Sequence, residues 1–191
     1  ANDGKDDWVV FKAPNGGNTH GSSNNTRTEL AQIKKWYPKT ANDRLTATLK
    51  VMNVSSTGDA RVAATHAVGV GQIHSADAFE NEPLKIFYKK YPGHTKGSVF
   101  WHYEINTAGD DNSKRWDYST AVWGNDFSVV GETADTYPAE PEDGIALDEE
   151  FSYEVVVKDG IMSLKFMSDG HETKTFTKNL LESEYPTQAD I

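Results

Sequence analysis

Two Asp-Gly pairs, ten residues apart, constrain the fold of this chain more than any other feature. Asp159-Gly160 and Asp169-Gly170 separate stretches in which apolar and polar residues alternate, as in Phe151-Ser-Tyr-Glu-Val155. Alternation with a period of two is typical of a strand that buries one face. Asp-Gly is favoured in the two-residue type I′ turns that join antiparallel strands. The sequence therefore predicts a meander of three antiparallel strands towards its C-terminal end.

Similar runs predict strands along most of the chain. The other predicted strands span residues 8–13, 27–32, 44–54, 61–75, 84–90, 97–106 and 116–122. No segment keeps a helical period over three turns; residues 178–184 are expected to form one short helical turn, and residues 131–148 a long surface loop. Many short strands with regular turns predict an all-β chain, an antiparallel β-sandwich of jelly-roll type. At 191 residues we expect a single domain, residues 1–191.

Charge and composition exclude several classes of partner. The formal net charge is −10, which disfavours nucleic acid and anionic membranes as partners. No stretch approaches the roughly 18 apolar residues of a membrane span. The chain has no cysteine, so disulfides and thiolate metal sites are excluded. Because it begins with Ala1 and not Met, as a chain does after removal of a signal peptide, we expect a secreted protein, extracellular or periplasmic.

Two polar pairs stand on segments that otherwise look like strands. Arg27 and Glu29 are two residues apart in TRTEL, and Gln72 and His74 are two residues apart in GQIH. Side chains two apart in an extended chain project from the same face. Taken singly, each pair is most simply a cross-strand ion pair or a solvated surface.

Two lysines strengthen the functional interpretation. Lys85 and Lys89 fall on one face of the next predicted strand, PLKIFYKK. In a chain this acidic, a row of cations beside Gln72 and His74 indicates an anionic substrate.

The motifs RTEL, at residues 27–30, and QIH, at residues 72–74, resemble those of the alginate lyases of polysaccharide lyase families 7 and 18. The likeness extends over most of the chain, from about Trp8 to about Phe176. It implies a jelly roll in which both motifs lie on neighbouring strands of a concave, substrate-binding sheet. It also implies that the partner is alginate, an anionic chain of 1,4-linked uronates, which is cleaved by β-elimination.

The resemblance assigns chemical roles to the polar pairs. Arg27 and Gln72 would neutralise the uronate carboxylate, and His74 would take the proton from C5. Glu29 would orient Arg27 at the substrate-binding surface, to which Lys85 and Lys89 would contribute cations. No metal or cofactor is required. Calcium could bind at Asp110-Asp-Asn112, although an exposed acidic loop is the simpler explanation.

Two features depart from the family pattern. Ala31 follows RTEL where the family usually has Arg, and the third motif, Tyr-x-Lys-Ala-Gly-x-Tyr-x-Gln, does not occur in these 191 residues. That motif supplies the tyrosine that protonates the leaving group. We therefore expect a further segment, C-terminal to Ile191 and present as a separate chain, to carry the tyrosine; the alternative is a pseudo-enzyme.

Other functions remain open at this stage. A non-catalytic carbohydrate-binding module or lectin would use the same sandwich and needs neither base nor acid, so His74 within QIH favours the enzyme. A lyase acting on another polyuronate, such as glucuronan, is a further alternative. In this family, Ile73 in QIH implies acceptance of guluronate, alone or together with mannuronate.

Overall fold

The computed structural model describes residues 1–19, 25–59, 64–74, 82–105, 116–127 and 137–181. They belong to two compact units, Ala1–Lys35 and Trp36–Ile191. All the described strands lie in the second unit. Within the described residues no helix has the length and apolar character needed to cross a membrane.

The first unit corrects two predicted strands. Residues 8–13 and 27–32 form no ladder, and the described bridge in this unit joins Asn2 to Asp7. The backbone carbonyls of Lys12 and Pro14 instead accept hydrogen bonds from the hydroxyls of Thr28, at 2.6 Å, and Thr26, at 2.9 Å. Alternation of residue types alone does not make a strand, because a strand needs a partner ladder for its backbone groups.

One sheet of the second unit contains the predicted meander. Strands β1 (Asn42–Lys50), β7 (Glu150–Lys158), β8 (Ile161–Met167) and β9 (Lys174–Asn179) are antiparallel in the order β1-β7-β8-β9. Asp159 and Gly160 have φ values of 49° and 86°, as the predicted type I′ turn requires. The predicted helical turn at 178–184 is wrong where it is described, because β9 continues to Asn179. Residues 182–184 lie outside the described part.

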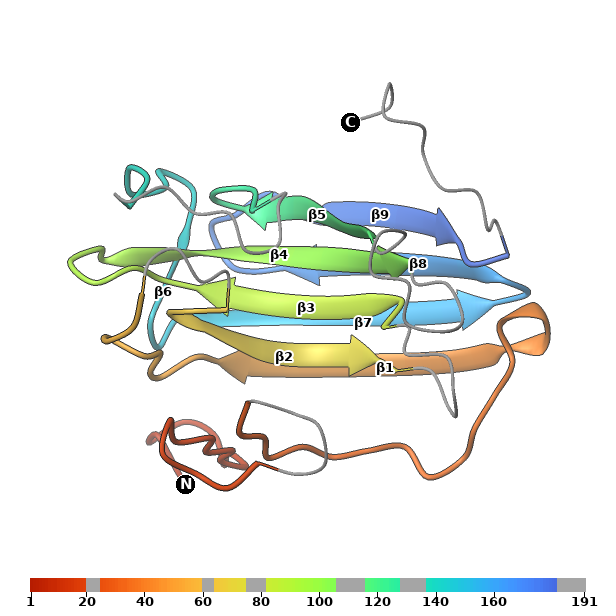
Figure 1. Ribbon diagram of the computed structural model, residues 1–191, viewed down its shortest axis with the longest axis horizontal. Helices are drawn as coiled ribbons and strands as arrows, with labels where there is room; N and C mark the ends of the chain where they lie inside the picture. The colour runs from red at the N-terminus through yellow and green to blue at the C-terminus, as the bar shows by residue number, and fades with distance from the viewer. Residues whose placement is uncertain (20–24, 60–63, 75–81, 106–115, 128–136, 182–191) are drawn as a thin grey trace. The chain divides into compact units, whose positions relative to one another are not determined.

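The other sheet carries the QIH motif. It consists of β2 (Ala67–Ile73), β3 (Leu84–Lys89), β4 (Lys96–Ile105) and β5 (Trp116–Trp123), antiparallel in that order, with the short β6 (Ile145–Ala146) beside β4. A single 3-10 turn, η1 (Pro38–Thr40), precedes β1. In Figure 1 this β2–β5 sheet lies in front of the sheet formed by β1, β7, β8 and β9. The predicted all-β, antiparallel sandwich is confirmed.

The core lies between the two sheets and follows from the alternation. On β3, Leu84, Ile86 and Tyr88 are fully buried, and their neighbours Lys85, Phe87 and Lys89 project from the opposite, outer face. From the same sheet, β4 and β5 add Val99, Trp101 and Trp123 to the buried cluster. The facing sheet contributes alternate residues of β7 and β8, namely Phe151, Tyr153, Val155, Val157, Met162, Leu164 and Phe166. Trp101 and Trp123 therefore pack in the core.

A β-bulge in β2 changes which residues reach the outer face. Gly69 pairs with Phe87 and Gly71 with Ile86, so the register shifts between the two glycines. The bulge inserts one extra residue into β2. As a result, side chains before the bulge point to the opposite face from the one expected of a regular strand. His66, whose parity in a regular strand would match Gln72 and His74, instead precedes β2 with φ 61° and is buried.

Gly97 is a point where the fold tolerates no side chain. A Cβ there would lie 2.6 Å from the backbone oxygen of Lys89 and 2.7 Å from the ring of Tyr88. We expect Gly97→Ala to lower the free energy of unfolding by about 1–3 kcal/mol, because the obstructing oxygen belongs to a paired strand. Gly69→Ala is the matched control, since its Cβ would meet Phe87 at an ordinary 3.7 Å. Urea unfolding of both variants provides the measurement; equal midpoints would contradict the prediction.

Candidate active site

The residues of the two motifs lie in different units. Arg27 and Glu29 belong to the first unit, outside any strand, with Arg27 Nη1 3.6 Å from Glu29 Oε1. Gln72 is on β2 of the second unit, and His74 follows the end of that strand. The predicted ion pair between Arg27 and Glu29 is therefore present. The RTEL motif belongs to the first unit and the QIH motif to the second.

The outer face of the β2–β5 sheet brings Gln72 next to other polar residues. Gln72 stands opposite Lys85 of β3, which in turn stands opposite His102 of β4. Directly paired residues in an antiparallel sheet project to the same side, so the three form a row across the strands. Gln72 and His74 are exposed, whereas His102 is buried.

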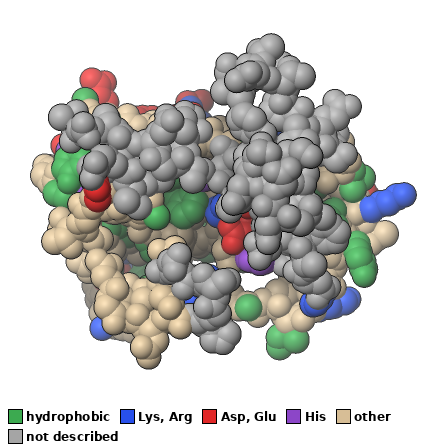
Figure 2. Space-filling model, in the orientation of Figure 1, with side chains coloured by type: hydrophobic (Ala, Val, Ile, Leu, Met, Phe, Trp, Pro, Cys, Tyr) green, Lys and Arg blue, Asp and Glu red, His purple; other side chains and the backbone are tan. Residues whose placement is uncertain are grey.

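A chain of charged contacts runs from His74 across this face. His74 Nε2 lies 3.4 Å from Glu82 Oε1, and Lys85 Nζ lies 3.0 Å from Glu82 Oε2. Lys85 also contacts Glu104 of β4, whose side chain is fully buried. Figure 2 shows basic, acidic and histidine side chains gathered near the middle of the face turned to the viewer. These contacts connect His74, after the end of β2, to the buried Glu104 on β4.

Lys85 has a different environment from the one expected of a substrate-binding cation. Its side chain is 15% exposed and two carboxylates contact its ammonium group, so its charge is balanced within the protein. Sequence reasoning missed both carboxylates. Glu104 could have been proposed from the sequence, because it lies two residues from His102 on a predicted strand and so shares a face with it. No feature of the sequence pointed to Glu82.

Lys89 is on the outer face, as predicted, but its side chain is buried. It is 2% exposed, and its ammonium lies 5.1 Å from the centre of the Tyr91 ring and 5.0 Å from that of Phe127. Burial lowers the pKa of Lys89 to about 8, because the charged form loses its hydration. This burial speaks against the predicted direct contact with substrate.

The buried ammonium of Lys89 makes stability depend on pH. Between about pH 8 and pH 10.5 the unfolded chain holds a proton that folded Lys89 has released, so stability rises with pH over this range. We expect Lys89→Met to be more stable than wild type at pH 7, and this advantage to shrink by about 2–3 kcal/mol by pH 10. Denaturant unfolding at both pH values measures it. Lys165→Met, at an exposed position of β8, is the control, and a pH-independent difference for Lys89→Met would contradict the prediction.

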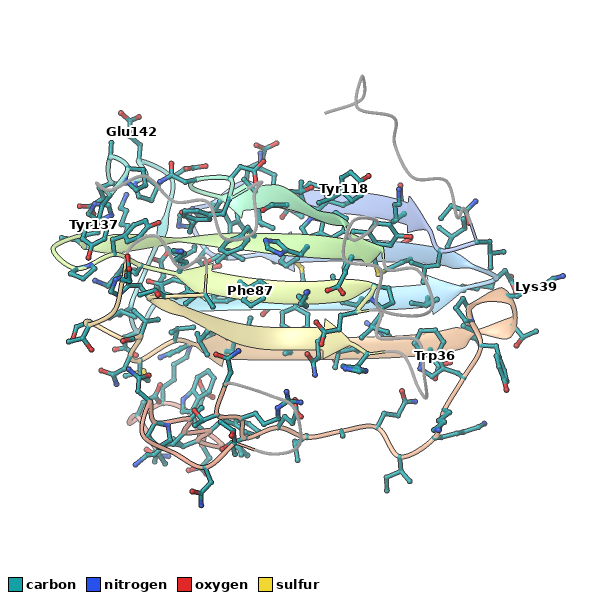
Figure 3. The ribbon with its side chains drawn as sticks, in the orientation of Figure 1. Trp36, Lys39, Phe87, Tyr118, Tyr137 and Glu142 are labelled. Atoms are coloured by element: carbon teal, nitrogen blue, oxygen red, sulfur yellow. The ribbon has the colours of Figure 1, made fainter. Side chains whose placement is uncertain are left out.

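Aromatic rings continue from Lys89 along the outer face of the sheet. Phe87 stacks on Phe100 with centroids 5.4 Å apart, and Phe100 contacts Phe127 at 4.9 Å. Beyond them, Tyr91 stacks on Tyr137 at 4.4 Å. In Figure 3, Phe87 lies at mid-sheet and Tyr137 at one end of it. One end of the face is therefore aromatic and the other, near His74, is charged.

His66 lies within the aromatic end and is held on both ring nitrogens. Its Nδ1 is 2.6 Å from the carbonyl oxygen of Ser55, and its Nε2 is 3.4 Å from the Tyr137 hydroxyl. The ring also packs edge-on against Tyr91 and Tyr137, each at 5.7 Å. These contacts assign His66 a structural role.

No metal centre is found among the residues that the structure describes. None of them forms a group of three or more His, Asp or Glu side chains suited to a metal ion. The Asp110-Asp-Asn112 turn, where calcium was considered, lies outside the described residues.

Comparison with known proteins shows which proteins this chain resembles. The chain is 28% identical over 213 residues to an alginate lyase from Klebsiella pneumoniae, covering 93% of this chain and 63% of that protein. Among solved structures, it is similar to the exolytic PL7 alginate lyase AlyA5 from Zobellia galactanivorans, with 67% identity and a TM-score of 0.89, covering 98% of this chain and 59% of that one. The structure of the alginate lyase from Klebsiella pneumoniae is 31% identical with a TM-score of 0.60, covering 73% of this chain and 45% of that one.

This chain thus spans about three fifths of the length of the first two of these relatives. The alginate lyase family itself matches residues 1–190. The chain belongs to the alginate lyase family.

Proposed function

We propose that the protein cleaves alginate by β-elimination, leaving an unsaturated uronate at the new non-reducing end. The observation that carries the proposal is the exposure of Gln72 and His74 at one end of the β2–β5 sheet, in a chain of the alginate lyase family. An exposed imidazole beside an amide donor supplies a base and a ligand for a carboxylate.

The proposed reaction removes the proton at C5 of the uronate and expels O4. His74 accepts the C5 proton, the electron pair of that C–H bond becomes the C4–C5 double bond, and the C4–O4 bond breaks. Arg27 and Gln72 donate hydrogen bonds to the uronate carboxylate, which stabilises the enolate-like charge as it develops. Glu29 orients the Arg27 guanidinium, a role supported by the 3.6 Å contact between them. These steps use no metal ion.

Expulsion of O4 needs an acid, which we assign to the tyrosine of the third family motif. We propose that a segment C-terminal to Ile191 carries it and pairs beside β2. Within the described residues the strand paired with β2 is β3, and in antiparallel sheets a strand can pair along both edges. Mass spectrometry of the active protein under denaturing conditions tests this: we expect polypeptide mass beyond these 191 residues, and full activity of a 191-residue polypeptide alone would contradict it.

We also propose the mode of action and the location. Exolytic cleavage is supported by 67% identity to a lyase described as exolytic. An exolytic enzyme releases small products while the viscosity of the polymer falls slowly, so comparison of viscosity with product absorbance tests the mode. We propose acceptance of guluronate, alone or with mannuronate, because the resemblance to the family associates Ile73 in the QIH motif with guluronate. Secretion fits a substrate that is an extracellular polymer.

The decisive test of the function is the ultraviolet absorbance of the conjugated double bond. We expect absorbance to rise with guluronate-rich alginate and not with a neutral polysaccharide. Mannuronate-rich alginate and glucuronan, tested in parallel, establish the substrate range. Binding of alginate without any rise in absorbance would instead support the carbohydrate-binding alternative.

A further inference from the structure

The carboxylate of Glu82 lies between His74 and Lys85. Its Oε1 is 3.4 Å from His74 Nε2, and its Oε2 is 3.0 Å from Lys85 Nζ. The side chain of Glu82 is 25% exposed, whereas that of His74 is 49% exposed. Each carboxylate oxygen therefore faces a different partner, and one of these is the proposed base.

Lys85 ties this carboxylate to the rigid part of the sheet. Lys85 is on β3 and contacts Glu104 of the neighbouring strand β4, whose side chain is fully buried. A side chain whose partner is fixed by a paired strand keeps one position, which is what a precisely placed reactive group requires. Glu82 thus holds His74 to the sheet through Lys85, although His74 itself lies beyond the end of β2.

The 3.4 Å contact between His74 Nε2 and Glu82 bears on the tautomer of His74. An ionised carboxylate accepts hydrogen bonds and cannot donate them, so a hydrogen bond between this pair requires the hydrogen on Nε2. A neutral imidazole with hydrogen on Nε2 has its lone pair on Nδ1. Nδ1 is then the nitrogen able to accept a proton.

We propose that Glu82 is a positioning residue that holds His74 in the Nε2–H tautomer, so that Nδ1 removes the C5 proton. The inference rests on the proposed elimination. In the step, the C5 proton binds to Nδ1, the C–H electron pair passes to the uronate, and His74 becomes an imidazolium. Glu82 stays ionised throughout and never receives the proton. The imidazolium afterwards releases its proton to water.

Three charged side chains, Glu82, Lys85 and Glu104, extend from His74 along the contacts described above. Glu82 and Glu104 carry two negative charges and Lys85 one positive charge, so these contacts are balanced when His74 becomes cationic. His102 is the other titratable group of the row, opposite Lys85 on β4. An opposite charge close to a developing cation stabilises it, which is how a carboxylate supports a histidine base.

Nitrogen-15 NMR of the histidine rings tests the tautomer directly. At mildly alkaline pH, where an ordinary imidazole is neutral, we expect His74 to show hydrogen on Nε2 and a lone pair on Nδ1. Comparison with His74→Ala assigns its signals among the six histidines. In Glu82→Ala we expect the two tautomers to mix. Hydrogen on Nδ1 of His74 in the wild-type protein would overturn the inference.

Kinetics test the consequence for the reaction. We expect Glu82→Gln, which keeps the shape and removes the charge, to lower kcat at least about tenfold with KM changed less than about twofold, because the carboxylate acts on the base and not on the substrate. Glu154→Gln is the matched control: its carboxylate pairs with Arg44 on the other sheet and is 30% exposed, and we expect unchanged kcat.

The two measurements separate this inference from the proposed function. An active wild-type protein in which Glu82→Gln leaves kcat unchanged would overturn the role of Glu82 alone. If the wild-type protein shows the Nε2–H tautomer but performs no elimination, the proposed function fails. The positioning role of Glu82 in that reaction then fails with it, while the tautomer assignment stands.

Discussion

Replacing His74 by alanine is expected to lower kcat/KM for alginate by about 10²–10⁴-fold, the usual contribution of a general base. The fold should be preserved. His74 lies beyond the end of β2 with 49% of its side chain exposed, and surface substitutions of this kind change stability by no more than about 0.5 kcal/mol. Product absorbance gives the rate and circular dichroism checks the fold.

His94→Ala is the control for this experiment. His94 packs edge-on against Tyr91 at 5.9 Å, at the aromatic end of the sheet, and has no role in the proposed reaction. We expect its activity to stay within a few-fold of wild type. A similar result for His74→Ala would show that His74 is not the base.

Lys85→Met is expected to destabilise the protein by about 3–5 kcal/mol, because it removes a cation from a buried carboxylate. The Glu104 side chain is fully buried and contacts Lys85, so the variant leaves its negative charge without that partner. Adding Glu104→Gln removes the charge, and the double variant should recover part of the lost stability. Urea unfolding at neutral pH measures all three proteins.

Arg44→Met is the matched control for this charge effect. Arg44 contacts Glu154 but is 66% exposed, and an exposed pair contributes no more than about 1 kcal/mol. The alternative, that Lys85 binds substrate carboxylates, predicts a raised KM with unchanged stability. A Lys85→Met protein as stable as wild type would favour that alternative.

The sequence predicted the strands well where alternation coincided with turn chemistry. Strands β7 and β8 flank Asp159-Gly160, and both the alternation and the positive φ values follow from the residue types. The segments that became β3, β4 and β5 were also placed to within one residue at each end. In the first unit the same alternation did not produce strands, since residues 27–32 form no ladder within the described part of the chain.

The candidate site was predicted only in part. Gln72 and His74 are both exposed. The contact of Glu82 with both His74 and Lys85 could not be foreseen, because Glu82 lies outside the strands, where residue spacing does not predict the direction of a side chain. Likewise, a bulge at Gly69 and Gly71 reverses the parity of β2, and nothing in the residue types fixes where such a bulge falls.

Mass spectrometry of the products formed in ¹⁸O-labelled water tests the central claim most directly. Elimination breaks the C4–O4 bond without adding water, so the fragment with the new non-reducing end should be lighter than a hydrolysis product by one water molecule. Neither fragment should contain ¹⁸O introduced by cleavage, and His74→Ala should yield almost no product. Fragments that have gained a labelled water would identify a hydrolase and contradict the account.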